Sequence, residues 1–290
     1  MLKMSLRYCK ISLLYWRSDW RVKALLLITF CVILNYTGGI YQLSELTGEA
    51  VSPWIFNFLF AGFYIGTGLL KVLLLLGAVL LFCNAPFLHR NKPFLILRCG
   101  REAWAFGDIL YILTGSFLYT LYIFLCSLLC FIPRIRFQTD WGKIIGTLAY
   151  TDASSRYAPT LIMNQKVLDY YTPLQATGIS FFLVMCGFVF IGLVIYLINR
   201  SERTRGMGMA AAVFFILLDP LMIFLNAKKA RWFSPLSWLS IEQLAPVKEQ
   251  GYPALGYVIL ALLALLLILS CVLMRGKDKI SIIGEVDNGT

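Results

Sequence analysis

Apolar and basic residues recur with helical periodicity over the first twenty-one residues. The cations share one narrow face of the expected helix: Lys3, Arg7, Lys10, Arg17 and Arg21. The apolar residues share a neighbouring face: Leu2, Leu6, Cys9, Leu13, Trp16 and Trp20. A helix of this kind lies in a membrane interface, where Trp and Leu enter the lipid and cations meet anionic headgroups. The pattern therefore predicts an interfacial helix over 1–21, with anionic lipids as its partner.

Downstream of this helix, long apolar runs predict membrane spans, each of which needs about 20 residues. There are six such runs: 22–41, 54–83, 107–132, 174–198, 207–226 and 254–274. The second run is long for one span and contains Lys71 and several glycines, so that it tilts or begins with an interfacial turn. The expected fold is all-α, a single polytopic transmembrane domain over 1–290.

Composition and charge support a membrane protein with both ends on one side. Hydrophobic residues make up 59% of the chain and charged residues 14%, whereas a soluble domain has about a quarter charged. The net charge of +11 comes from cations that flank the apolar runs, where the positive-inside rule places them. The predicted outer loop 42–53 has no Lys or Arg. Both termini are therefore expected in the cytoplasm, and nucleic-acid binding is disfavoured.

Two predicted outer loops are unusually apolar. The stretch 232–244 is interrupted by Pro235 and is too short to span, so it favours a re-entrant or interfacial pair of short helices shielded by protein. Within 133–173, an apolar stripe at helical spacing suggests a segment lying on the membrane. The stripe consists of Trp141, Ile144, Ile145 and Leu148.

Motifs for catalysis, cofactors and metals are missing from the sequence. His89 is the only histidine and is expected to be a solvated loop side chain. Cys126 and Cys130 are four residues apart on one apolar helix, which favours packing over metal binding. No P-loop sequence occurs, so any ATP must be bound by another chain. We expect no catalytic, cofactor or metal site here, and no enzyme activity.

Two ionisable residues, Lys71 and Asp219, fall inside predicted spans. Each is about twelve residues from the inner end of its span, which is about 18 Å at 1.5 Å per residue. Charges at this depth usually face a partner or a water-filled cavity. One interpretation is a buried ion pair or a pair lining a translocation path. The other is that Lys71 snorkels and that Asp219 marks a break beside Pro220.

The predicted inner segment 89–108 suggests a docking element. Pro93 suits a first helical turn, and Gly100 suits the end of a short helix over 94–99. A second helix then restarts and enters the third span. A soluble partner could push such an element, although an ordinary interfacial connector would have the same pattern.

The layout resembles the permease subunit of ABC-2-type transporters. Leu97-Arg98-Cys99-Gly100-Arg101-Glu102-Ala103-Trp104, followed by Gly107, is similar to the family's coupling segment, and Ser234-Pro235-Leu236-Ser237-Trp238 is similar to its outer re-entrant element. Asp108 departs from the pattern, since a lysine is common there. The resemblance implies that the ATPase is contacted by Phe94, Leu97, Arg98, Arg101, Glu102 and Trp104.

The resemblance also implies function and partners. It implies a permease in a bacterial plasma membrane, which exports or extracts a hydrophobic or amphipathic substrate. A cytoplasmic ABC ATPase would bind ATP and Mg²⁺, and a second permease subunit, identical or related, would complete the path. The alternative from another class is a non-transporting membrane scaffold or assembly factor, and an intramembrane enzyme is disfavoured by the lack of polar clusters.

Overall fold

The structure is a computed structural model that describes residues 2–62, 68–85, 101–159, 161, 163–201, 204, 206–225, 232–244 and 253–275. Its described part is all-helical and has no strand beyond one isolated bridge between Val51 and Ile135. Six helices form the bundle: α2 (Trp20–Thr47), α3 (Leu69–Phe82), α5 (Arg101–Leu129), α9 (Pro173–Asn199), α10 (Met207–Phe224) and α11 (Leu255–Arg275). The predicted all-α fold is confirmed.

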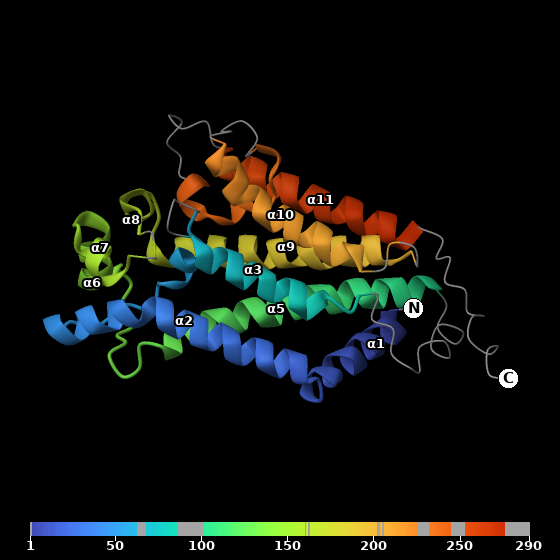
Figure 1. The fold of residues 1–290 in the computed structure, drawn as a ribbon, viewed down its shortest axis with the longest axis horizontal. Coiled ribbons are helices and arrows are strands. Elements are labelled where there is room, and N and C mark those ends of the chain that lie inside the picture. The colour runs from blue at the N-terminus through green and yellow to red at the C-terminus, as the bar shows by residue number, and fades with distance from the viewer. Residues whose placement is uncertain are drawn as a thin grey trace.

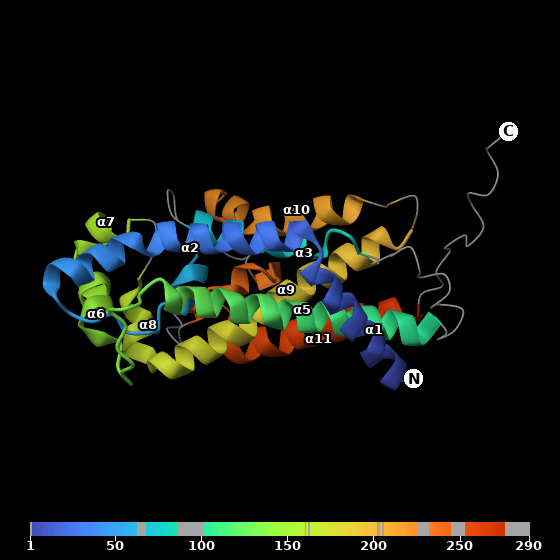
Figure 2. The ribbon, with the colours of Figure 1, turned by 90° about the horizontal axis from the view of Figure 1, so that it is seen from below.

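The bundle helices run along the long axis of the molecule, with α9 at the centre (Figures 1 and 2). Helix α9 contacts α3, α5, α10 and α11, and most of its residues are buried. Its start is well specified locally, because Thr172 and Gln175 form a capping box ahead of Pro173. The apolar residues that follow on all sides suit a helix surrounded by other helices.

Five of the helices are long and apolar enough to cross a membrane: α2, α5, α9, α10 and α11. The protein is therefore a multi-pass membrane protein, and the prediction of six spans is confirmed only in part. The remaining run, 54–83, is broken into a short 3₁₀ helix, η2 (Phe56–Phe60), and the 14-residue α3. Gly68 directly precedes α3. Its φ of +87° lies in the left-handed region, a conformation that favours glycine.

Helix α1 (Leu2–Leu14) packs along α5 and buries one member of its predicted apolar face, Cys9, whereas Leu6 is exposed. Ser5, Tyr8, Cys9 and Ser12 form its buried stripe, and the Ser5 hydroxyl donates to the Ala103 carbonyl at 2.8 Å. Small residues on both helices allow this close approach. The predicted lipid contact of Cys9 is therefore wrong, because neutral polar pairing with α5 decides which face is buried.

The end of the interfacial helix also differs from prediction. The helix stops at Leu14, a 3₁₀ turn η1 (Tyr15–Arg17) follows, and Asp19 caps α2, so that Trp20 belongs to α2. Trp16 is half-buried and donates its ring N–H to the Tyr111 hydroxyl of α5 at 2.7 Å. Trp20 is exposed, as are the predicted basic residues Arg7, Lys10 and Arg17.

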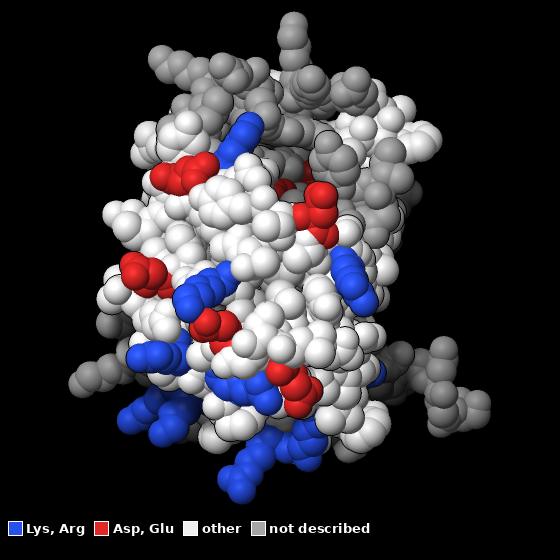
Figure 3. Space-filling model, turned by 90° about the vertical axis from the view of Figure 1, so that its left-hand side faces the viewer, with Lys and Arg blue, Asp and Glu red and all other residues white. Residues whose placement is uncertain are grey.

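Three short helices form a cap at the end of the bundle opposite α1 (Figure 1). They are α6 (Gly142–Tyr150), α7 (Ala153–Tyr157) and α8 (Gln165–Tyr170). Ile144, Ile145 and Leu148 are buried in the core, so this stripe packs on protein rather than lying on the membrane. Acidic and basic residues are interspersed over this end (Figure 3), and one exposed ion pair joins Lys143 to Glu49.

Candidate functional site

Lys71 and Asp219 meet in the interior of the bundle. Lys71 is the third residue of α3, and Asp219 is on α10. The Lys71 ammonium donates to Asp219 Oδ2 at 2.8 Å, and their side chains are only 2% and 4% exposed. The structure therefore supports the first interpretation of the sequence, a buried ion pair, and excludes a snorkelling Lys71.

Asp219 is followed by Pro220, a proline inside α10. Proline lacks a backbone N–H, so the helical bond to the carbonyl four residues earlier is missing beside Asp219. The second carboxylate oxygen of Asp219, Oδ1, is buried and has no hydrogen-bond partner within the described residues. A buried carboxylate with one free oxygen is costly, which makes Asp219 depend strongly on Lys71.

Ser240 is a third member of the site that sequence reasoning missed. Its hydroxyl lies 3.0 Å from the Lys71 ammonium, which donates to it. The same hydroxyl donates to the Phe60 carbonyl at 2.9 Å. Phe60 ends η2, and Ser240 lies between two further 3₁₀ turns, η5 (Ser237–Leu239) and η6 (Ile241–Leu244). Ser240 thus ties Lys71 to two short segments that are far apart in the sequence.

The segment 232–244 enters the bundle interior. Ser234, Leu236, Leu239 and Ser240 are fully buried, and Leu239 contacts Gly187 of α9 so closely that a β-carbon there would lie 2.7 Å from its Cδ2. The stretch predicted as a re-entrant or interfacial pair of short helices contains two 3₁₀ turns, η5 and η6. Irregular backbone of this kind is tolerated at membrane depth only where protein buries it.

Glu242 is a second carboxylate at the site. Its Oε1 accepts a hydrogen bond from the Gly62 backbone N–H at 2.5 Å. Burial raises the pKa of Glu242 to about 7, and the nearby charge of Asp219 acts in the same direction. The Gly62 bond and the Lys71 charge partly oppose this rise.

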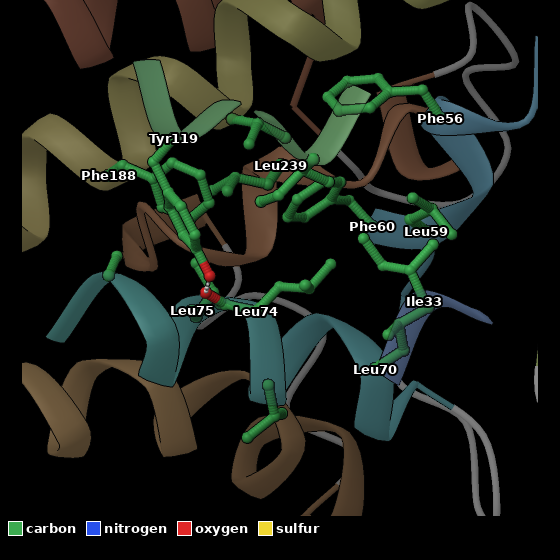
Figure 4. Packing of buried hydrophobic residues seen from close by; sticks show 14 of the residues in the cluster. Ile33, Phe56, Leu59, Phe60, Leu70, Leu74, Leu75, Tyr119, Phe188 and Leu239 are labelled. Carbon is green, nitrogen blue, oxygen red and sulfur yellow. Dashed lines mark hydrogen bonds between the residues drawn. The ribbon is translucent and has the colours of Figure 1, made fainter. Parts of the chain in front are cut away.

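Apolar side chains surround the cluster on the inner side of these segments. Figure 4 shows Phe60 and Leu239 packed beside Leu70 and Leu74 of α3, with Phe188 of α9 close to Tyr119. The rings of Tyr119 and Phe188 have centroids 5.1 Å apart. Such surroundings strengthen electrostatic interactions and make an unpaired charge more costly.

The predicted ATPase-contact residues are only partly placed. Phe94, Leu97 and Arg98 lie outside the described residues, and Arg101 begins α5. Glu102 is exposed at the start of this helix. Trp104 is buried, and its ring meets that of Tyr196 edge-on with centroids 6.5 Å apart. Direct contact of Trp104 with a partner is therefore wrong, because the ring packs between α5 and α9.

Asp108, where the sequence departs from the resembled pattern, is fully buried on α5. It faces Tyr8 of α1, whose pKa is raised mainly by burial and further by this carboxylate. Gly107 allows the approach, since a β-carbon there would lie 2.7 Å from the Tyr8 ring. Asp108 therefore belongs to the packing of α1 on α5.

No known protein family, curated protein or solved structure matches this chain.

Proposed function

We propose that the protein is the membrane-spanning permease subunit of an ATP-driven transporter. The observation that carries the proposal is the meeting of two short segments with 3₁₀ turns, η2 and 232–244, at a buried ion pair. Irregular segments beside a charged pair within a helical bundle are a recurring feature of transporter binding sites. A protein that served only as a membrane anchor would have no need for Lys71, Asp219 and Ser240 in its interior.

The substrate is proposed to be hydrophobic or amphipathic. Aromatic residues make up 15% of the chain, and the buried groups around the site are mostly apolar. A path for a small, strongly hydrated ion would need more polar lining groups than Lys71, Asp219 and Ser240 supply. Segment 232–244 is proposed to act as an outer re-entrant element and Lys71 with Asp219 to line or brace the path.

The energy source is proposed to be a separate cytoplasmic ABC ATPase that binds ATP and Mg²⁺. Its contact is proposed to be the segment 94–102 ahead of α5, which carries the basic residues Arg98 and Arg101. A second permease subunit would form the other half of the path. The protein is placed by this proposal in a bacterial plasma membrane with both termini in the cytoplasm, where Arg7, Lys10 and Arg17 would meet anionic lipids.

Affinity purification in mild detergent tests the proposal. We expect a stoichiometric ATP-binding protein to copurify with the wild-type chain and to be lost from Arg98→Glu plus Arg101→Glu. The matched control is Lys143→Glu plus Arg156→Glu, which reverses two exposed charges at the opposite end of the bundle and should retain the ATPase. If no ATPase copurifies with any form, the scaffold or assembly-factor alternative replaces the transporter.

A further inference from the structure

Glu242 joins two buried segments that are 180 residues apart in the sequence. One is the end of η2, where the backbone N–H of Gly62 points at the carboxylate, and the other is η6, which carries Glu242. A methyl group at position 62 would lie 2.7 Å from Glu242 Oε1. An added β-carbon would also press on the Gln243 side-chain amide, so both side chains would have to move to admit it.

The charges around this contact do not cancel when Glu242 is ionised. Asp219 and Glu242 supply two negative charges, and Lys71 supplies one positive charge. Lys71 is already engaged by Asp219 at 2.8 Å and by Ser240 at 3.0 Å. On the other side of η6, the Tyr171 hydroxyl donates to the Leu244 carbonyl and not to a carboxylate. Among the residues that the structure describes, the cluster thus has one more negative charge than positive charges.

We infer that Lys71, Asp219 and Glu242 form a proton-binding site, in which Glu242 exchanges one proton and thereby changes the bond between η6 and Gly62. The inference concerns the chain alone and does not depend on the proposed ATPase partner.

The chemistry is a simple proton transfer. A hydronium ion gives its proton to the Glu242 carboxylate, which becomes a carboxylic acid while water is released, and the cluster changes from one net negative charge to neutral. The N–H of Gly62 then faces a neutral acceptor, and hydrogen bonds to neutral acceptors are weaker than those to ionised ones. The pKa of Glu242, raised to about 7 by burial, places this exchange in the neutral range.

The link between the two segments would accordingly vary in strength with pH. It is strongest when Glu242 is ionised and weakest when Glu242 is protonated, whereas the Lys71–Asp219 pair persists in both states. A proton would therefore act locally on segment 232–244 and the end of η2, without dismantling the bundle.

Infrared difference spectroscopy of the full chain in lipid nanodiscs tests the site. We expect the carbonyl stretch of one protonated carboxyl group to titrate with a midpoint near pH 7 and to vanish in Glu242→Gln. The band should persist in Glu49→Gln, an exposed glutamate, and in Asp108→Asn, which removes a buried carboxyl of α5. Survival of the band in Glu242→Gln, or no carboxyl titration between pH 5 and 9, would overturn the inference.

Two neighbouring variants give shifts of opposite sign that a purely structural role for Glu242 would not produce. Asp219→Asn removes a negative charge and should lower the midpoint, whereas Lys71→Met removes a positive charge and should raise it. Either shift alone suffices if the other variant fails to fold, and a midpoint unchanged in every folded variant would contradict the cluster.

Hydrogen exchange of the Gly62 region tests the link between the segments. After correction for intrinsic rates, wild-type protection should fall severalfold on acidification through the midpoint. In Glu242→Gln it should stay low at every pH. Protection that follows pH equally in both proteins would show that Glu242 does not control the contact.

Discussion

Within the described residues, two lysine–carboxylate pairs of similar length lie in opposite surroundings. Lys71 and Asp219 are 2.8 Å apart with side chains 2% and 4% exposed, and Lys143 and Glu49 are 2.6 Å apart with side chains 79% and 45% exposed. In water the attraction is screened and largely offset by lost side-chain freedom. In the interior each ion has lost its hydration and depends on its partner. Burial, and not distance, therefore separates a structural requirement from a surface contact.

The largest expected effect comes from removing one member of the buried pair. Lys71→Met or Asp219→Asn leaves a buried group without its partner and should lower the free energy of unfolding by about 3–5 kcal/mol. The double variant should recover much of this loss. Unfolding in detergent, followed by fluorescence, measures all three proteins. A double variant no more stable than the worse single one would show that the two residues do not act as a pair.

The next effect is the pH dependence that Glu242 introduces. Its pKa is raised from 4.5 to about 7, so the folded state binds a proton that the unfolded state releases between these values. This contribution to the free energy of unfolding is complete below pH 4.5 and is lost as the pH rises to 7. The change is at most about 3 kcal/mol at 1.36 kcal/mol per pKa unit.

Unfolding measured from pH 4.5 to 8 for the wild type and Glu242→Gln gives this contribution as the difference between the two curves. We expect the wild type to lose stability relative to Glu242→Gln as the pH rises. Parallel curves would mean that the folded protein leaves the pKa of Glu242 unchanged.

A smaller loss is expected from Gly62→Ala. The added methyl group would lie against Glu242 and Gln243, so the carboxylate must move and its bond to the backbone is lost. The expected cost is about 1–3 kcal/mol, the range for a buried donor that loses its acceptor. The control is Gly178→Ala on α9, where a β-carbon meets nothing within 4 Å. Equal stability of the two variants would refute the close contact at position 62.

The smallest effect is expected from the exposed pair. Lys143→Met, Glu49→Gln and their double variant should each change the free energy of unfolding by less than about 1 kcal/mol. The difference between the variants and the wild type should shrink further in high salt. The same detergent unfolding assay measures them, and a loss as large as that at Lys71 would remove the distinction between the two pairs.

Long apolar runs allowed most helices to be predicted closely. The run 174–198 corresponds to α9 (Pro173–Asn199) and 254–274 to α11 (Leu255–Arg275), because a span needs about 20 apolar residues and both runs have clear polar limits. The run 54–83 was expected to tilt or to begin with an interfacial turn, and it contains the 3₁₀ helix η2 followed by the 14-residue α3. Its hydropathy is continuous, yet contacts with segment 232–244 stabilise a 3₁₀ turn at Phe56–Phe60.

The residues of the candidate site were also predicted only in part. Lys71 and Asp219 were found from the sequence, since a charge inside an apolar run is unusual enough to mark a site. Ser240 and Glu242 were not found, because a serine and a glutamate in an outer loop carry no signal until Phe60 and Gly62 lie against them. Trp16 was assigned to the lipid-facing side, and its hydrogen bond to Tyr111 was not predicted, because that bond depends on the packing of α1 on α5.

The sequence by itself determined that this is a multi-pass helical membrane protein and that Lys71 and Asp219 place charge inside its apolar runs. Both follow from local composition, since hydropathy and helix length act within one segment. Only the tertiary structure decided that Lys71 pairs with Asp219 and that Glu242 holds Gly62. These contacts join residues 148 and 180 positions apart, and interactions over such separations depend on how the helices pack, which no local pattern records.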